Sequence, residues 1–314
     1  MLDRMFTNDA GLEMTVLKQP CIRSNIMLVD HLLELVDIDP HPDIDGVRVA
    51  EHLVDDVLRE ILDPNGQVNQ GRAATCAPTG IQALLINENA AEYVRLMRGL
   101  LSIGQQATLA NNDVINPPVA IFRAARYSGN QSRPFYIRTN AELAFQATML
   151  KYARGGSFPS YDPDAPPDSP RGINTVFQAT IGRGLSFDQI KTALDGLFNR
   201  SFEKHIVDAP TAAMRNQFVN AMQASSDPLL TIMHWRKPHT DDDTALHAVM
   251  ALRHEANRTF FKNPQYSGSR PPSGAVSNGA AENPPRRTDD PSQALESMGD
   301  DDLTNWVRGY YTSA

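Results

Sequence analysis

The chain has 314 residues, of which 41% are hydrophobic and 21% charged, and its net charge of −8 gives a pI near 5.5. This length is enough for one large domain or two ordinary ones with a sizeable core. The acidic balance offers no basic surface for nucleic acid. No run of about 18 apolar residues occurs, so we expect no transmembrane helix. The first residues lack the pattern of a Sec-type signal peptide.

Cys21 and Cys76 are the only cysteines, which excludes a disulfide framework and leaves Cys76 free to react. Residues 69–85 are the most informative stretch, because a polar, glycine-bearing loop leads into Cys76 and apolar residues at helical spacing follow it. Pro78 suits the first turn of that helix, where its missing N–H has no partner. We therefore expect Cys76 at a helix start, where backbone N–H groups and the dipole favour a thiolate. The alternative interpretation of Cys76 is that it is a small, buried, apolar side chain of the core.

Amphipathic patterns predict two helices before this loop, over residues 24–36 and 46–62. In the first helix, Ser24 or Asn25 is the expected N-cap. The apolar face predicted for it consists of Ile26, Val29, Leu32, Leu33 and Val36. We interpret residues 1–62 as a helical N-terminal segment that is either accessory or pro-like.

Further helices are predicted after the cysteine, and capping patterns at Asn89 and Ser186 open two of them. They cover residues 89–101, 139–154, 172–184, 186–197 and 211–224. A long loop over residues 155–172 interrupts this series, and loops of this length are usually functional or mobile.

The pattern changes to strands at residue 229. Residues 229–235 form a short apolar run, and an alternating strand from residue 244 is followed by a polar connection and a second strand over 259–262. A hairpin turning near residue 255 places His247 opposite Asn263, with their Cβ atoms about 4.5–5.5 Å apart. An amide oxygen on one imidazole nitrogen leaves the other nitrogen for a nucleophile. Taken singly, His247 is also typical of an ordinary sheet histidine, and Asn263 of a strand-end residue before proline.

A polar loop after residue 233 also contains possible metal ligands, namely His234, His239 and the aspartates at 241–243. These residues lack any recognised ligand spacing, so we interpret the segment as a solvated loop. We expect no metal and no other cofactor.

The separate motifs together resemble one family. Gln70-x5-Cys76, then His247-Ala248-Val249, then Lys262-Asn263-Pro264 follow the Gln…Cys…His…Asn order of the papain-like cysteine peptidases. Ala77 replaces the aromatic residue that usually follows the cysteine, and Pro264 stands where a tryptophan is usual. These departures favour a remote branch of the superfamily, such as a bacterial cysteine peptidase, effector or toxin.

The resemblance implies an α+β, papain-like fold, in which a helical subdomain carrying the nucleophile helix packs on a small antiparallel sheet carrying the histidine and asparagine. It implies a Cys76 nucleophile, a His247 acid and base, an orienting Asn263 and an oxyanion donor in Gln70. The expected reaction is hydrolysis of an amide bond in a protein or peptide substrate.

The predicted boundaries follow from these motifs. Residues 63–266 form the catalytic core, with a helical region over 77–228 and a sheet region over 229–266. Residues 267–293 form a loop rich in proline and glycine, and residues 294–314 a C-terminal helix packed on the core.

Two alternatives stay open. The same triad could serve a deamidase, an amidase or a transglutaminase-like acyl transferase, or the chain could be a catalytically inactive binding module. We expect neither nucleic acid nor membrane as a partner, and the oligomeric state is open. We expect synthesis in a bacterial cytoplasm, with any export by a specialised, non-Sec route.

Overall fold

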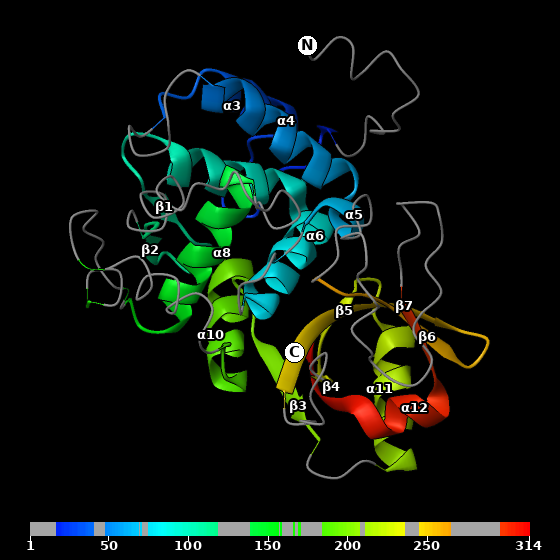
Figure 1. Ribbon diagram of the computed structural model, residues 1–314. Coiled ribbons are helices and arrows are strands. Elements are labelled where there is room, and N and C mark those ends of the chain that lie inside the picture. Colours follow the sequence, from blue (N-terminus) through cyan, green and yellow to red (C-terminus); the bar gives the residue numbers. More distant parts are fainter. Residues whose placement is uncertain are drawn as a thin grey trace, which may run out of the picture.

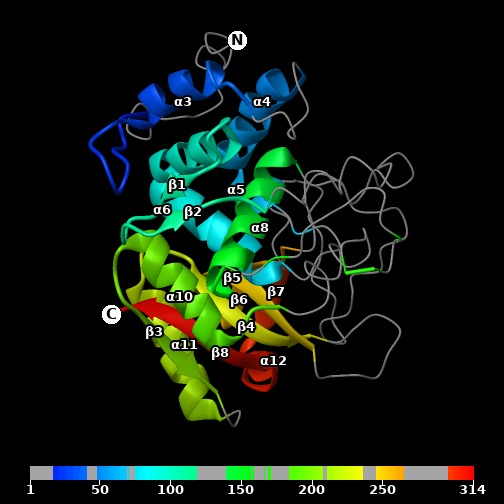
Figure 2. The same cartoon turned by 90° about the vertical axis from the view of Figure 1, so that its left-hand side faces the viewer.

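The computed structural model describes residues 17–40, 48–68, 70, 75–118, 139–156, 158, 166, 169–170, 184–207, 211–235, 245–264 and 296–314. The predicted α+β class is confirmed, since a group of helices lies against one antiparallel sheet (Figure 1). The sheet and its two covering helices occupy one end of the molecule, and the N-terminal helices occupy the other (Figure 2).

The helical part is built around one long helix that begins at the predicted cysteine. Its elements are α3 (Leu28–Val36), α4 (Arg48–Leu62), α5 (Pro64–Gln67), α6 (Cys76–Leu101), α8 (Asn140–Ala153) and α10 (Phe187–Phe198). Capping boxes open both α8 and α10, with Thr139 and Ser186 as the N-caps. The box at Ser186 confirms the capping pattern predicted there, whereas for α8 the sequence predicted the helix but not its cap.

The first of these helices differs from its prediction. α3 begins at Leu28 and not near Ser24, because Cys21 and Ser24 form a turn and Pro20 pairs with Met27 in an isolated β-bridge. The buried face is consequently different from the predicted one. It consists of Leu28, His31, Leu32 and Leu35.

α6 consists of two helical halves joined by a kink. Asn89 has non-helical angles (φ −153°, ψ 84°), and its side-chain oxygen accepts the N–H of Glu92 at 2.8 Å. Asn89 therefore caps the second half, as the sequence predicts for a helix starting there. The first half packs on the sheet, where Gly80 lies against Leu230 and Met250.

Six antiparallel strands form the main sheet, in the order β3-β8-β4-β5-β6-β7. They are β3 (Phe202–Ile206), β8 (Val307–Ser313), β4 (Leu229–Trp235), β5 (Ala245–Glu255), β6 (Arg258–Lys262) and β7 (Glu296–Gly299). A separate two-stranded sheet joins β1 (Ala107–Thr108) and β2 (Val114–Ile115).

The sequence predicts a C-terminal helix over residues 294–314, and this is wrong for residues 296–299, which form β7, and again beyond residue 306. The helix α12 (Asp300–Trp306) is short, and the chain continues as β8, which pairs with both β3 and β4. The β8 sequence is rich in aromatic and β-branched residues, which suit a strand. β3 itself was not predicted, because it lies in the region expected to be helical.

Two hydrophobic cores lie on opposite faces of the sheet. Leu230 of β4 and Met250 of β5 belong to the larger core, which they share with α3, α4, α6, α8 and α10. Val249 and Ala251 belong to a second core with Phe218 of α11 (Ala212–Ala224) and with α12. Neighbouring residues of β5 thus face opposite cores, as its predicted alternation requires.

Some predictions fall outside the described residues. They include the loop over 267–293, almost all of the helix predicted over 172–184, and most of the loop over 155–172. Among the described helices, none is long and apolar enough to span a membrane.

Gly309 is a test of the close packing around β8. A Cβ there would meet the ring of Phe187 and lie 2.7 Å from the backbone oxygen of His205. We expect Gly309→Ala to lower the free energy of unfolding by roughly 1–3 kcal/mol, as overpacking does. Urea unfolding measures this, with Gly184→Ala as the control because a Cβ at Gly184 meets nothing within 4 Å. Equal stability of the two variants would contradict the packing argument.

Candidate active site

Cys76 is the first residue of α6, directly after the N-cap Thr75. Its thiol is free and half-buried. The first backbone N–H groups of a helix have no partner within the helix, so they are available to a negatively charged group at this end. The prediction that a helix starts at Cys76 is confirmed.

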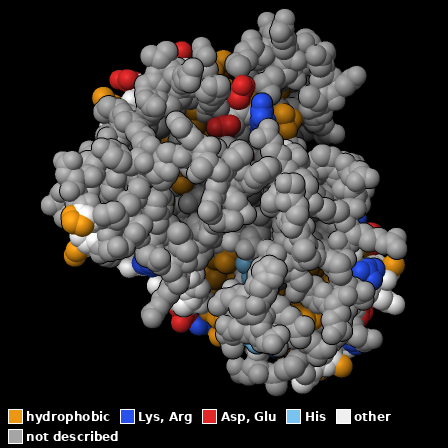
Figure 3. All heavy atoms as spheres, viewed as in Figure 1, with side chains coloured by type: hydrophobic (Ala, Val, Ile, Leu, Met, Phe, Trp, Pro, Cys, Tyr) orange, Lys and Arg blue, Asp and Glu red, His pale blue; other side chains and the backbone are white. Residues whose placement is uncertain are grey.

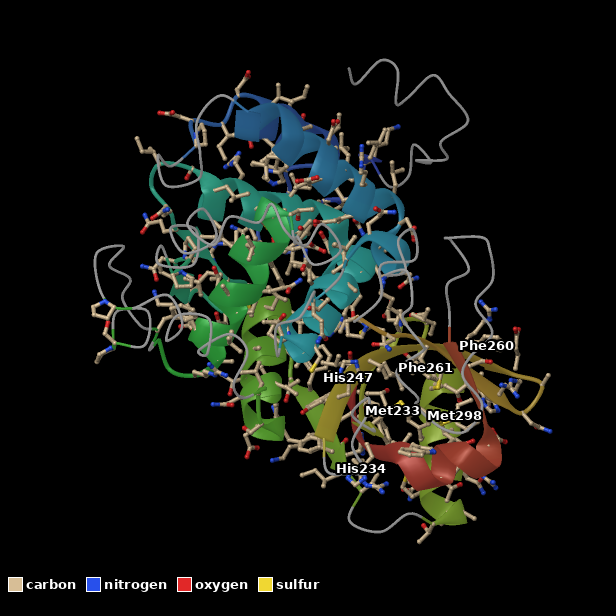
Figure 4. The ribbon with its side chains drawn as sticks, viewed as in Figure 1. Met233, His234, His247, Phe260, Phe261 and Met298 are labelled. Carbon is tan, nitrogen blue, oxygen red and sulfur yellow. The ribbon has the colours of Figure 1, made fainter. Side chains whose placement is uncertain are left out.

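His247 lies near the start of β5, opposite Met233 of β4. It is 7% exposed and forms a side-chain hydrogen bond with Cys76. Figure 4 shows His247 at the end of β5 nearest the start of α6. In the space-filling view, histidine and hydrophobic side chains reach the surface at this junction (Figure 3). The imidazole therefore joins the sheet to the nucleophile helix.

Asn263 follows β6 and holds the other side of the imidazole. Its Oδ1 lies 2.8 Å from Nε2 of His247, and both residues are buried. An amide oxygen can only accept, so Nε2 carries a proton in this bond and Nδ1 is the nitrogen left for Cys76. The three side chains form one continuous chain from thiol to amide.

The hairpin that carries His247 and Asn263 is confirmed, and its turn residues are Ala256 and Asn257, within the predicted polar connection and directly after residue 255. Both turn residues have positive φ, 49° and 59°. This geometry matches the tight two-residue turns of hairpins. A β-bulge between Ala251 and Arg253 then adds one residue to β5 and shifts the pairing.

The prediction that His247 lies directly opposite Asn263 is wrong, because the observed register of β5 and β6 differs from the predicted one. The last paired residues are Met250 and Lys262, so the next position places Asn263 opposite Val249. His247 and Asn263 are therefore diagonal neighbours on one face and are not directly opposed. Diagonal side chains lie farther apart, but rings and longer side chains can bridge that distance.

Opposing effects act on the Cys76 thiol. Burial raises its pKa, whereas the hydrogen bond and positive charge of His247 lower it. Backbone hydrogen bonds of Ala248 and Ala77 lower the pKa further. The net result is a thiol pKa below the ordinary value, which favours the nucleophilic thiolate.

Gln70 is buried and lies on the segment before Cys76. Its backbone N–H donates to the carbonyl oxygen of Pro264 at 2.8 Å. This bond ties the Gln70 segment to the residue directly after Asn263. The structure thus brings Gln70, Cys76, His247 and Asn263 to one place, although they come from distant parts of the chain.

Sequence reasoning missed the backbone groups of the site. The Ala248 amide contacts the thiol, and the Pro264 carbonyl holds Gln70. Every residue has a backbone carbonyl and almost every residue has an N–H, so no residue type signals these roles.

Cys21 has a different environment. Its Sγ lies 2.7 Å from the hydroxyl of Ser24 and accepts the Ser24 N–H at 3.1 Å, within the turn before α3. The second cysteine is therefore an internal comparator for the reactivity of Cys76.

The possible metal ligands are only partly described. His234 lies on β4, whereas His239 and the aspartates at 241–243 lie outside the described residues. In the part of the chain that the structure describes, no three His, Cys, Asp or Glu side chains are grouped so that they could hold a metal ion.

Comparisons with known proteins find no match, whether to protein families, to curated proteins or to solved structures.

The lowered thiol pKa predicts fast alkylation of Cys76 by iodoacetamide in mildly acidic solution. An acid with a depressed pKa stays ionised as the pH falls, until the pH passes that pKa. We expect the Cys76 rate to persist well below about pH 8.5, the ordinary thiol pKa. Peptide mass spectrometry of one digest follows Cys76 and Cys21 together. A Cys76 rate that rises only near the ordinary thiol pKa would refute this.

Proposed function

We propose that the protein is a cysteine hydrolase that cleaves an amide bond by the mechanism of papain-like peptidases. The observation that carries this proposal is the unbroken hydrogen-bonded chain of Cys76, His247 and Asn263. A thiol, a base and a group that orients the base are the parts that nucleophilic catalysis requires. The position of the thiol at a helix start and its lowered pKa support the same function.

In the first step, the Cys76 thiolate attacks the carbonyl carbon and forms a C–S bond. The oxygen becomes an oxyanion, which the Cys76 N–H and the side-chain amide of Gln70 stabilise. The protonated imidazole of His247 then gives its proton to the leaving amine as the C–N bond breaks. The product is a thioester on Cys76.

In the second step, His247 takes a proton from water, and the resulting hydroxide attacks the thioester. The carboxylic acid product leaves, and the thiolate is regenerated beside the protonated imidazole. Asn263 holds the ring so that Nδ1 faces the sulfur throughout both steps. An amine in place of water would give acyl transfer at the same site.

The arrangement of elements supports a papain-like fold as part of this proposal. The nucleophile begins the central helix of a helical part, and the histidine and asparagine belong to an antiparallel sheet. α4 supports the accessory interpretation of the N-terminal segment, because Leu53, Val57 and Leu58 are buried in the core that α6 shares. The proposed substrate class is a protein or peptide.

Substitutions at the site test the proposal with a panel of fluorogenic peptide amides, ubiquitin-like amides and glutamine peptides. Cys76→Ala is expected to abolish turnover and His247→Ala nearly so, whereas Asn263→Ala lowers it less because it only orients the ring. Gln70→Ala is expected to lower kcat by about 10²–10³, the usual effect of losing one oxyanion donor.

The matched control is Cys21→Ser, which is expected to keep the wild-type rate. Product masses separate peptide cleavage, release of ammonia from glutamine, and incorporation of an added amine. Full activity in Cys76→Ala would refute the proposal. If the wild-type protein turned over none of these substrates and the pKa of Cys76 were not lowered, a binding module would be favoured.

A further inference from the structure

A second set of polar side chains lies behind Cys76, inside the helical core. Thr75 donates its hydroxyl proton to Oε1 of Gln146 at 3.0 Å, and Nε2 of Gln146 donates to Oε1 of Gln82 at 3.0 Å. Nε2 of Gln82 then donates to Oε2 of Glu60 at 3.1 Å and to the hydroxyl of Tyr93 at 3.0 Å. All five residues are at most 1% exposed. Three helices, α4, α6 and α8, meet in this network.

The hydrogen bonds of this network all run in one direction. Tyr93 also hydrogen bonds to Glu60, so the amide group of Gln82 faces two oxygens that can accept. This orientation turns the Gln82 oxygen toward Gln146, and the Gln146 oxygen is in turn directed toward Thr75. Hydrogen bonds in such a chain polarise one another. Glu60 and Tyr93 therefore determine which atom Thr75 meets.

Thr75 does not use its hydroxyl as a helix cap, although it is the N-cap residue of α6. A threonine in this position commonly accepts an N–H of the first turn. Here the hydroxyl is directed into the core, and the Thr75 carbonyl accepts both the N–H and the hydroxyl of Thr79, at 2.8 and 2.7 Å. The side chain and the carbonyl of Thr75 are thus both anchored.

The anchored carbonyl belongs to the peptide that contains the Cys76 N–H. Because a peptide unit is planar, the direction of the Thr75 C=O also fixes the direction of the Cys76 N–H. That N–H is the proposed oxyanion donor, and Cys76 Cα follows it directly. A shift of Thr75 would move both the donor and the thiolate relative to His247.

We propose that Glu60, Gln82, Gln146 and Thr75 form a positioning chain that holds the N-terminus of α6 in register with His247. This inference rests on the proposed function and deepens it, because it assigns positioning residues to the same site. None of the four touches the reacting atoms. Glu60 belongs to α4, so the N-terminal helical segment contributes to the geometry of the nucleophile.

The state of Glu60 is consistent with this role. Burial raises the pKa of Glu60, as does the charge of Glu142, and the hydrogen bonds from Tyr93 and Thr139 lower it by less. Gln82 faces acceptor oxygens whichever of Glu60 and Tyr93 carries the proton between them. The orientation of the chain therefore holds wherever that shared proton lies.

A double-mutant cycle on the full chain tests the inference, with Cys76 alkylation at pH 6 as the readout. Thr75→Val removes the hydroxyl at the near end and Gln82→Met removes the link to Glu60. Each is expected to lower the alkylation rate about fivefold, as the loss of one hydrogen bond does. Each also raises the apparent pKa of the thiol. If both act through one chain, the double variant is no worse than either single variant.

Conservative and unrelated variants separate positioning from mere loss of stability. Thr75→Ser keeps the hydroxyl and is expected to stay within about twofold of wild type. Thr148→Val and Glu92→Gln change equally buried residues of α8 and α6 that bond elsewhere, and they leave the pH profile unchanged. Tyr93→Phe is a milder change at the far end and replaces Gln82→Met if that variant folds poorly.

The alkylation profiles test the positioning chain and the proposed function separately. An ordinary thiol profile in wild-type Cys76 would overturn the proposed function. A lowered pKa in wild type that no chain variant moves, or effects of Thr75→Val and Gln82→Met that simply multiply, would overturn the positioning chain alone. A profile that shifts equally in Thr148→Val would also overturn it.

Discussion

The geometry of the candidate site depends on how closely α6 approaches the sheet. Gly80 makes this approach possible, because a Cβ there would lie 2.5 Å from a methyl of Leu230 and 3.6 Å from the sulfur of Met250. A larger residue would have to displace the Leu230 side chain or shift the helix relative to β4. Cys76 lies one turn before this contact, so the thiol stays within hydrogen-bonding distance of a side chain on β5. Close packing at a glycine thus contributes to the short distance between Cys76 and His247 on which the proposed chemistry relies.

The close packing of α6 on the sheet also has opposing effects on the pKa of the Cys76 thiol. A thiol placed between a helix and a sheet loses water, and burial by itself raises its pKa. The imidazole of His247 reverses this, but only while Asn263 keeps the ring turned correctly. The backbone amide of Ala248 adds to the effect because Cys76 lies directly against β5. The same contact that desolvates the thiol therefore supplies the groups that stabilise the thiolate.

Local sequence patterns predicted much of the fold, and non-local pairing explains where they failed. The start of α6 at Cys76, the caps at Asn89 and Ser186 and the strand β4 follow from short-range signals. β8 could not be predicted in this way, because its apolar spacing also suits a helix and its two neighbouring strands are distant in sequence. The hairpin turn was predicted to within about two residues, but its exact centre was not, since Ala256 is not a typical residue for positive φ. The bulge near Leu252 leaves no signal in the sequence, so the diagonal contact of His247 with Asn263 required the structure.

Polar residues occupy core positions of three helices, where they hydrogen bond to one another. An apolar core at Glu60, Gln82 and Gln146 would cost less desolvation, since buried polar groups stabilise a fold only when all are satisfied. Directional bonds, however, specify one arrangement of α4, α6 and α8, whereas apolar contacts tolerate small slides between helices. A slide of α6 along its axis would carry Cys76 away from the imidazole. In the proposed mechanism a thiolate must meet a histidine from another part of the fold, and a polar chain that fixes the position of α6 at some cost in stability would serve that need.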